Sequence, residues 1–188
     1  MRFKEFLAEA VSRAIPQIWY HGSKKDFSAF DLKYIITEES IAQEGPGFYL
    51  TSDAEDAEKY GLPNGFLKTV KLTSKMGIRN EKSAPFREGF MGNLINKMPD
   101  KEDVLSNWAE NPTRALYDLK KSILDSSDTG LEMAKNIWYE CYKGYEIDYV
   151  TKLKSGGIDG FIVNKQNGVK HLICYNPDIL KIIETKKL

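Results

Sequence analysis

The spacing of hydrophobic residues divides the chain into strand-rich ends and a helical middle. Residues 66–72, Phe-Leu-Lys-Thr-Val-Lys-Leu, alternate with the period of a half-buried strand. Residues 24–44 are expected to form a loop and a helical turn, and residues 73–84 a loop. Short apolar runs flanked by glycine or other turn residues predict further strands over residues 17–23, 47–51, 158–163, 169–175 and 179–184.

Apolar residues at helical spacing characterise residues 85–142. Within this segment, Asn111 before Pro112 is typical of a helix cap followed by a first-turn proline. Asp128 is a candidate cap for a second helix. Because strand-rich segments flank this helical block, the sequence predicts an α+β domain over residues 16–188. Its features are a split β-sheet and a helical insertion at 85–142.

Two shorter helices are predicted outside this insertion. The first covers residues 54–60, with Asp53 as its N-cap and Gly61 at its end. The second covers residues 145–154 and ends at a pair of glycines that begins with Gly156.

Composition and charge narrow the class of protein. With 188 residues and 41% hydrophobic content, the chain is long enough for one domain with a real core. Its 27 basic and 27 acidic residues cancel, which argues against a protein that mainly coats nucleic acid or an anionic membrane. No apolar run reaches the roughly 18 residues of a membrane helix. Two cysteines are too few for a disulfide framework, so we expect a reducing compartment.

A metal site is not expected. His171 and Cys174 are close in sequence, but residues three apart on a strand point to opposite faces. The chain contains one further histidine and one further cysteine, both distant in sequence. Structural zinc usually takes four ligands in paired spacing, which this sequence does not provide.

Two aromatic runs bounded by glycine carry the candidate chemistry. They are Trp19-Tyr20-His21-Gly22-Ser23 and Gly45-Pro46-Gly47-Phe48-Tyr49-Leu50-Thr51. Glycine beside a strand lets the backbone approach a ligand closely. Together with Phe27-x-x-Phe30-Asp31 and a short helix ending in Tyr60, these runs resemble the NAD-dependent ADP-ribosyltransferases. The similarity is to the diphtheria-toxin and poly-ADP-ribose-polymerase branch, of the phage and polyvalent-protein type, over residues 17–72 and 145–184.

The resemblance implies that NAD is the substrate, and it assigns roles to particular residues. The backbone of Gly22 is expected to meet the nicotinamide carboxamide, with Ser23 beside it. His21 is expected to hydrogen-bond a ribose hydroxyl. Tyr49 and Tyr60 are expected to stack on the nicotinamide ring. Taken singly, His21 also fits a core histidine and Tyr49 a core aromatic, and it is the set that favours a site.

The sequence departs from the family at the third catalytic position. The family usually has a glutamate on a late strand, and here that position is His171. The resemblance therefore implies a catalytic set of His21, Tyr49 and His171. A histidine can orient the ribose but cannot supply a negative charge. This favours transfer of a single ADP-ribose unit, or NAD hydrolysis, over chain elongation. A degenerate fold that only binds nucleotide or serves inside a phage head is the alternative.

Residues 1–15 have the spacing of an amphipathic helix that ends before Pro16. Charged residues interrupt it, so it is not a secretory signal. Its sequence resembles the capsid-targeting peptides of internal head proteins in large tailed phages, with a prohead-protease site between Glu9 and Ala10. The resemblance implies a monomeric phage effector that occupies the head interior and later the host cytoplasm. Its expected acceptor is a host protein or nucleic acid, with no membrane involved.

Overall fold

Seven strands of the described residues form one mixed sheet in the order β4-β5-β6-β2-β1-β3-β7. The computed structural model describes residues 15–35 and 44–188. All neighbouring strands are antiparallel except β4 and β5, which are parallel. The strands are β1 (Ile18–Ser23), β2 (Phe48–Thr51), β3 (Phe66–Leu72), β4 (Ile78–Asn80), β5 (Gly160–Asn164), β6 (Lys170–Cys174) and β7 (Leu180–Lys187).

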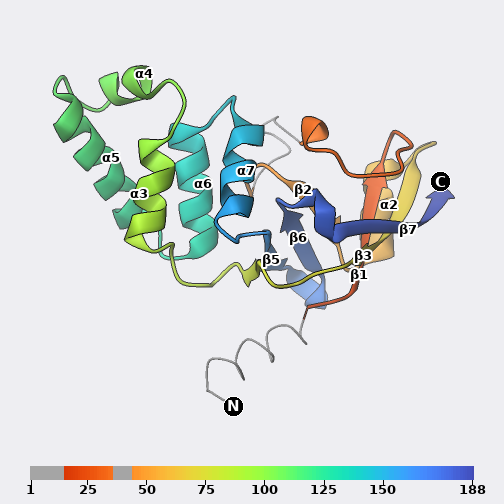
Figure 1. Cartoon of the computed structure of the whole chain (residues 1–188). Helices are drawn as coiled ribbons and strands as arrows, with labels where there is room; N and C mark the ends of the chain where they lie inside the picture. Colours follow the sequence, from red (N-terminus) through yellow and green to blue (C-terminus); the bar gives the residue numbers. More distant parts are fainter. Residues whose placement is uncertain (1–14, 36–43) are drawn as a thin grey trace, which may run out of the picture.

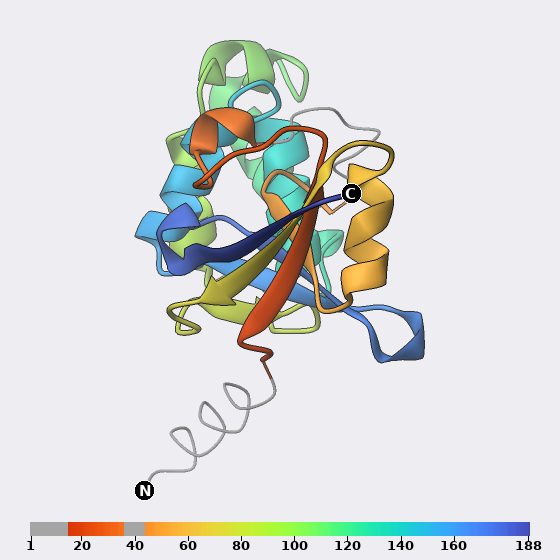
Figure 2. The same cartoon turned by 90° about the vertical axis from the view of Figure 1, so that its right-hand side faces the viewer.

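The helices fall into two groups. Helix α2 stands alone beside β1, whereas the other helices gather at the far end of the molecule next to β5 and β6 (Figures 1 and 2). Short 3-10 turns occur at Leu32–Tyr34, Gln166–Gly168 and Pro177–Ile179. The helices are α2 (Ala54–Gly61), α3 (Glu88–Asn96), α4 (Lys101–Ser106), α5 (Pro112–Asp125), α6 (Gly130–Cys141) and α7 (Glu146–Ser155).

The sheet is split at the junction of β1 and β2. The register there consists of one pair, Tyr20 opposite Thr51. By contrast, β1 pairs with β3 along its whole length, from Ile18 to Ser23. On the other side, β2 pairs with β6 through all four of its residues. The molecule therefore has two well-paired half-sheets joined by a short junction, which is the predicted split α+β arrangement.

The core is continuous across these parts. Buried residues of the sheet, such as Trp19 and Phe161, belong to the same cluster as Ile137 of α6 and Tyr149 of α7. The Tyr149 hydroxyl donates to the backbone oxygen of Ala134 at 2.6 Å, which satisfies a polar group deep in this core. The helical block and the half-sheet of β5 and β6 therefore form one rigid support for the junction.

Helix caps show where local sequence governs the fold. Asn111 caps α5 as predicted, its side chain accepting from two backbone N–H groups. The predicted cap Asp128 is wrong. Thr129 caps α6 instead, because its hydroxyl and the side chain of Glu132 form a reciprocal capping box. Four helices, α3 to α6, occupy the segment for which the sequence predicts a helical block.

Two strand boundaries differ from the expectation. β4 lies within the predicted loop at 73–84, because a three-residue strand gains its order from pairing with β5 and has no alternation of its own. β7 continues past residue 184 to Lys187, since its polar end still pairs with Phe66 and Leu67 of β3. The predicted N-terminal helix and the Glu9–Ala10 site lie outside the described residues. No helix among the described residues is long and apolar enough to span a membrane.

Candidate active site

A pocket of about 120 Å³ lies at the split between the half-sheets. It brings together residues that are far apart in sequence, from β1, β2, α2 and β6. Of the six residues that the sequence predicts for the site, all but Ser23 line it. The lining residues are Tyr20, His21, Gly22, Tyr49, Leu50, Thr51, Asp56, Ala57, Tyr60 and His171.

Gly22 is required here because α2 packs directly against β1. A Cβ atom on Gly22 would lie 1.9 Å from the backbone oxygen of Ala57 and 3.0 Å from the backbone nitrogen of Gly61. Any side chain at this position would force the helix off the strand. The contact fixes α2, with its Asp56 and Tyr60, against the end of β1.

The backbone of Gly22 points into the split. Leu72 donates to the backbone oxygen of Gln17, so β1 residues with odd numbers direct their N–H and C=O toward β3. Residues of β1 with even numbers therefore direct their backbone N–H and C=O groups toward β2. Tyr20 pairs with Thr51 there, but the pairing of β1 with β2 ends at Tyr20, two residues before Gly22. The N–H and C=O of Gly22 consequently face the pocket, where a carboxamide needs one donor and one acceptor.

His21 lies on the face of β1 opposite to Gly22, because side chains alternate along a strand. Its ring packs edge-on against Phe27 and Phe30, with centroid separations of 5.7 and 5.3 Å. These aromatics belong to the Phe-x-x-Phe-Asp motif that follows β1. The motif therefore holds the His21 ring in place at the edge of the split.

The chemical state of His21 follows from its partners. Nδ1 lies 2.8 Å from the backbone oxygen of Tyr49, so Nδ1 carries the proton and donates, which leaves Nε2 as an acceptor. Burial lowers the pKa of His21 below 6.5; the Tyr49 hydrogen bond opposes this shift and the nearby charge of Lys68 adds to it. His21 is therefore neutral at pH 7, and its Nε2 can accept a hydrogen bond from a hydroxyl.

Two tyrosines provide flat surfaces at the pocket. The Tyr49 hydroxyl donates to the backbone oxygen of Gly45, and burial raises its pKa, so the phenol stays neutral. Tyr60 is in the last turn of α2 and is 60% exposed. A half-exposed aromatic ring at the rim of a pocket gains most from stacking on a planar ligand.

His171 on β6 is opposite Thr51 on β2, and Thr51 is opposite Tyr20 on β1. The three side chains therefore lie on the same face of the sheet. Its Nε2 is 2.9 Å from Oδ2 of Asp56, on α2. Asp56 lies one helical turn before Tyr60, so the two share a helix face. Helix α2 therefore contributes both a carboxylate and an aromatic ring to the pocket.

Ser23 differs in position from the other predicted site residues. It is not part of the pocket lining, and its hydroxyl accepts a hydrogen bond from the backbone N–H of Lys25. It closes the turn after β1, and its predicted contact with NAD stays a prediction. Sequence reasoning missed Tyr20, Thr51 and Asp56, all of which line the pocket. The spacing of Asp56 and Tyr60 was the available signal for the carboxylate.

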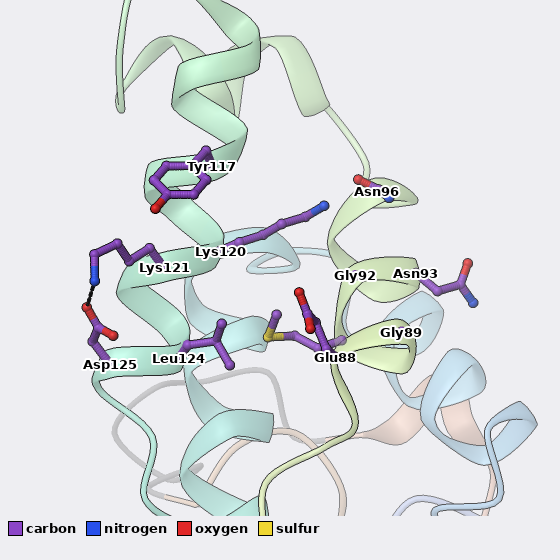
Figure 3. A pocket seen from close by; sticks show the side chains of 11 residues that line it. Glu88, Gly89, Gly92, Asn93, Asn96, Tyr117, Lys120, Lys121, Leu124 and Asp125 are labelled. Atoms are coloured by element: carbon purple, nitrogen blue, oxygen red, sulfur yellow. Dashed lines mark hydrogen bonds and ion pairs between the residues drawn. The ribbon is translucent and has the colours of Figure 1, made fainter.

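A larger cavity lies elsewhere, between α3 and α5 (Figure 3). Its volume is about 830 Å³, and none of the predicted site residues lines it. The Lys120 side chain extends from α5 toward α3, while Lys121 pairs with Asp125 at 2.6 Å (Figure 3). Within the described residues, no group of three or more metal-ligating side chains occurs in this cavity or elsewhere.

The split sheet with a glycine, two tyrosines and two histidines at its junction defines an ADP-ribosyltransferase domain. The family model described as ADP-ribosyltransferase in polyvalent proteins matches residues 14–187. The chain therefore belongs to this family. Members of the wider class use NAD as the donor of ADP-ribose.

The chain was also compared with curated proteins and with solved structures. A search of curated proteins gives no match. One solved structure, described as the crystal structure of an anti-CRISPR protein, matches with 12% identity and a TM-score of 0.34. The match covers 91% of this chain and 94% of that one. A similarity of this size carries no argument about function.

Proposed function

We propose that the protein is an NAD-dependent mono-ADP-ribosyltransferase that modifies a bacterial host macromolecule. The observation that supports this most is the convergence of His21, Gly22, Tyr49, Tyr60 and His171 on one pocket at the split. Family membership supports transfer of ADP-ribose in general. The pocket supports NAD as the donor, because its groups match the parts of nicotinamide riboside.

The reaction replaces one bond to the anomeric carbon by another. The bond from this carbon to the nicotinamide nitrogen breaks, and its electron pair leaves with nicotinamide, which becomes neutral. Positive charge then develops on the ribose. A lone pair of the acceptor forms the new bond, and the acceptor releases a proton. The enzyme must therefore hold the amide, orient the sugar and stabilise a cation.

The described groups suit the first two of these tasks, which are to hold the amide and to orient the sugar. The N–H and C=O of Gly22 bind the carboxamide, and Tyr49 and Tyr60 contact the faces of the ring. His21 accepts a ribose hydroxyl through Nε2. The pocket is smaller than the roughly 300–1,000 Å³ of sites that enclose a drug-sized ligand. It therefore has room for the nicotinamide end, and the rest of the dinucleotide extends beyond the pocket.

Transfer of a single unit is favoured by the side chain near the start of β6. Elongation requires a group that activates a hydroxyl of ADP-ribose already attached to the acceptor. The family's usual glutamate would do this, but the position holds His171. We therefore propose that the product carries one ADP-ribose unit.

The experiment is to incubate the protein with NAD labelled on the adenylate part, with and without host lysate. We expect nicotinamide release and a label attached to one class of macromolecule. The variant His21→Ala serves as the control for activity that depends on the pocket. Free labelled ADP-ribose without a labelled acceptor would instead identify an NAD hydrolase. Absence of nicotinamide release would overturn the proposal and favour an internal head protein with a degenerate fold.

We further propose that the protein is packaged in a phage head and reaches the host cytoplasm on infection. The support is the resemblance of residues 1–15 to capsid-targeting peptides, with the Glu9–Ala10 peptide bond as the cleavage site. Protein purified from virions should begin at Ala10, while recombinant protein keeps Met1. Virion protein with residues 1–9 intact would contradict processing by a prohead protease and leave the enzymatic proposal unaffected.

A further inference from the structure

The structure places a carboxylate next to the histidine that departs from the family pattern. His171 and Asp56 are partly buried, with side-chain exposures of 23% and 21%. They come from β6 and α2, which are far apart in sequence. The ring makes its hydrogen bond through Nε2, and no second partner of the ring occurs among the described residues. If the imidazole is neutral, Nε2 holds the proton and Nδ1 is an acceptor.

The surroundings of Asp56 keep it charged. Burial by itself would raise the pKa of Asp56, but hydrogen bonds from Lys59, His171 and Thr51 outweigh it, so that the pKa lies below its ordinary value. Its place in the first turn of α2 adds the favourable field of a helix N-terminus. The Lys59 side chain is 71% exposed, so water screens its ion pair with Asp56.

We propose that Asp56 is the positioning residue that makes His171 an effective substitute for the family's glutamate. This inference rests on the proposed function. Asp56 accepts the Nε2 proton and thereby directs Nδ1 of His171 toward the ribose hydroxyl. Its negative charge lies one hydrogen bond behind the imidazole and stabilises the cationic sugar through it. No proton moves between the two residues, and no bond to Asp56 forms during transfer.

The same geometry has a consequence for restoring the family's residue. A glutamate at position 171 would place a second carboxylate against Asp56. Two carboxylates at that separation repel, and one of them takes up a proton. His171→Glu alone should therefore work poorly. Combined with Asp56→Asn, the new glutamate would have an amide donor as its neighbour and would keep its charge.

The test measures nicotinamide release, kcat and KM for NAD in four proteins: the parent, Asp56→Asn, His171→Glu and the double variant. Partners that orient a metal-bound imidazole typically contribute a factor of about 10–100, and a partner that orients a substrate-binding imidazole is expected to act on the same scale. We expect Asp56→Asn to lower kcat by that factor with little change in KM. We expect the double variant to exceed His171→Glu, so that the two substitutions are strongly non-additive.

Controls separate this role from a structural one. Glu55→Gln removes a negative charge from the same helical turn at a residue outside the pocket, and it should leave kcat unchanged. Asp56→Glu keeps the charge and should retain more activity than Asp56→Asn. Thermal unfolding of each variant shows whether the fold is intact.

The outcomes distinguish the two proposals. If the parent releases no nicotinamide, the proposed function fails. If the parent is active and Asp56→Asn matches it in kcat, Asp56 has no positioning role and this inference is wrong. Should Asp56→Asn fold poorly, the comparison of His171→Glu with Asp56→Glu still decides. The inference expects Asp56→Glu to retain more activity than His171→Glu, so an equal loss of activity in these two variants would overturn it.

Discussion

Two cavities in the described part of the chain differ in size and in how firmly their polar groups are held, and the smaller one is the better organised. The cavity between α3 and α5 is about seven times larger than the pocket at the split, from 830 and 120 Å³. Yet the large cavity is lined by exposed side chains of two helices, such as Tyr117 at 65% exposure. The small pocket combines four elements and holds its polar groups through defined hydrogen bonds.

The difference shows which features distinguish a candidate catalytic pocket from a cavity between surface helices. At the split, strand pairing stops while the strands continue, so backbone groups and side chains face a common space. Between α3 and α5, each helix satisfies its own backbone, and charged residues such as Lys121 and Asp125 neutralise each other at the surface. Preorganised dipoles, rather than volume, are what stabilise a developing charge.

The largest effect that separates the two regions is expected at His171. His171→Ala removes a contact aimed at the reacting sugar and should lower kcat for NAD cleavage by roughly a hundredfold, about 3 kcal/mol. Thermal stability should change little, because the residue is partly exposed. If His171→Ala turns over NAD like the parent, the imidazole serves only packing, and the proposal that it contacts the reacting sugar is wrong.

A smaller effect, on stability, compares two glycines. Gly22→Ala would place a methyl group against the backbone of α2 and should lower the free energy of unfolding by about 1–3 kcal/mol. Gly89→Ala, in α3 beside the large cavity, meets no atom within 4 Å and should raise it by about 0.4–1 kcal/mol. Urea unfolding of both variants measures the difference. Equal stability of the two variants would mean that α2 does not sit against Gly22.

The smallest expected effect is in the large cavity. Replacing Tyr117 and Lys120 together by alanine should leave nicotinamide release within about twofold of the parent and stability within about 0.5 kcal/mol per site. The same variant should be assayed for acceptor labelling in host lysate. A loss of labelling with unchanged NAD cleavage would give the cavity a role in holding the acceptor. Both cavities would then take part in the reaction.

Much of the site was predictable because local sequence encodes it. The strand at 66–72 has the predicted bounds, and the cap Asn111 is where the sequence places it. Gly22 and Tyr49 carry the family pattern and lie at the pocket as expected. Strand alternation and helix capping act over a few residues, so they are visible without the fold.

What the sequence could not give depends on register between distant segments. Asp56 reads as an ordinary acidic residue in the first turn of a helix until Thr51 and His171 are placed opposite each other. β4 likewise acquires its order from β5. Ser23 matches the family's motif in sequence, but its hydroxyl is used by the turn after β1. For Asp56 and β4 a contact between distant segments of the chain decides between two locally equivalent interpretations, whereas for Ser23 a local turn decides.

The interleaving of early and late strands has a consequence for biosynthesis. β2 lies between β1 and β6, and β3 lies between β1 and β7, so each half-sheet needs strands from both ends of the chain. A ribosome extends a chain at about 5–20 residues per second. During that time His21 and Tyr49 have emerged but His171 has not. The candidate pocket therefore cannot assemble until β6 leaves the exit tunnel, so its completion is one of the last steps in the synthesis of the domain.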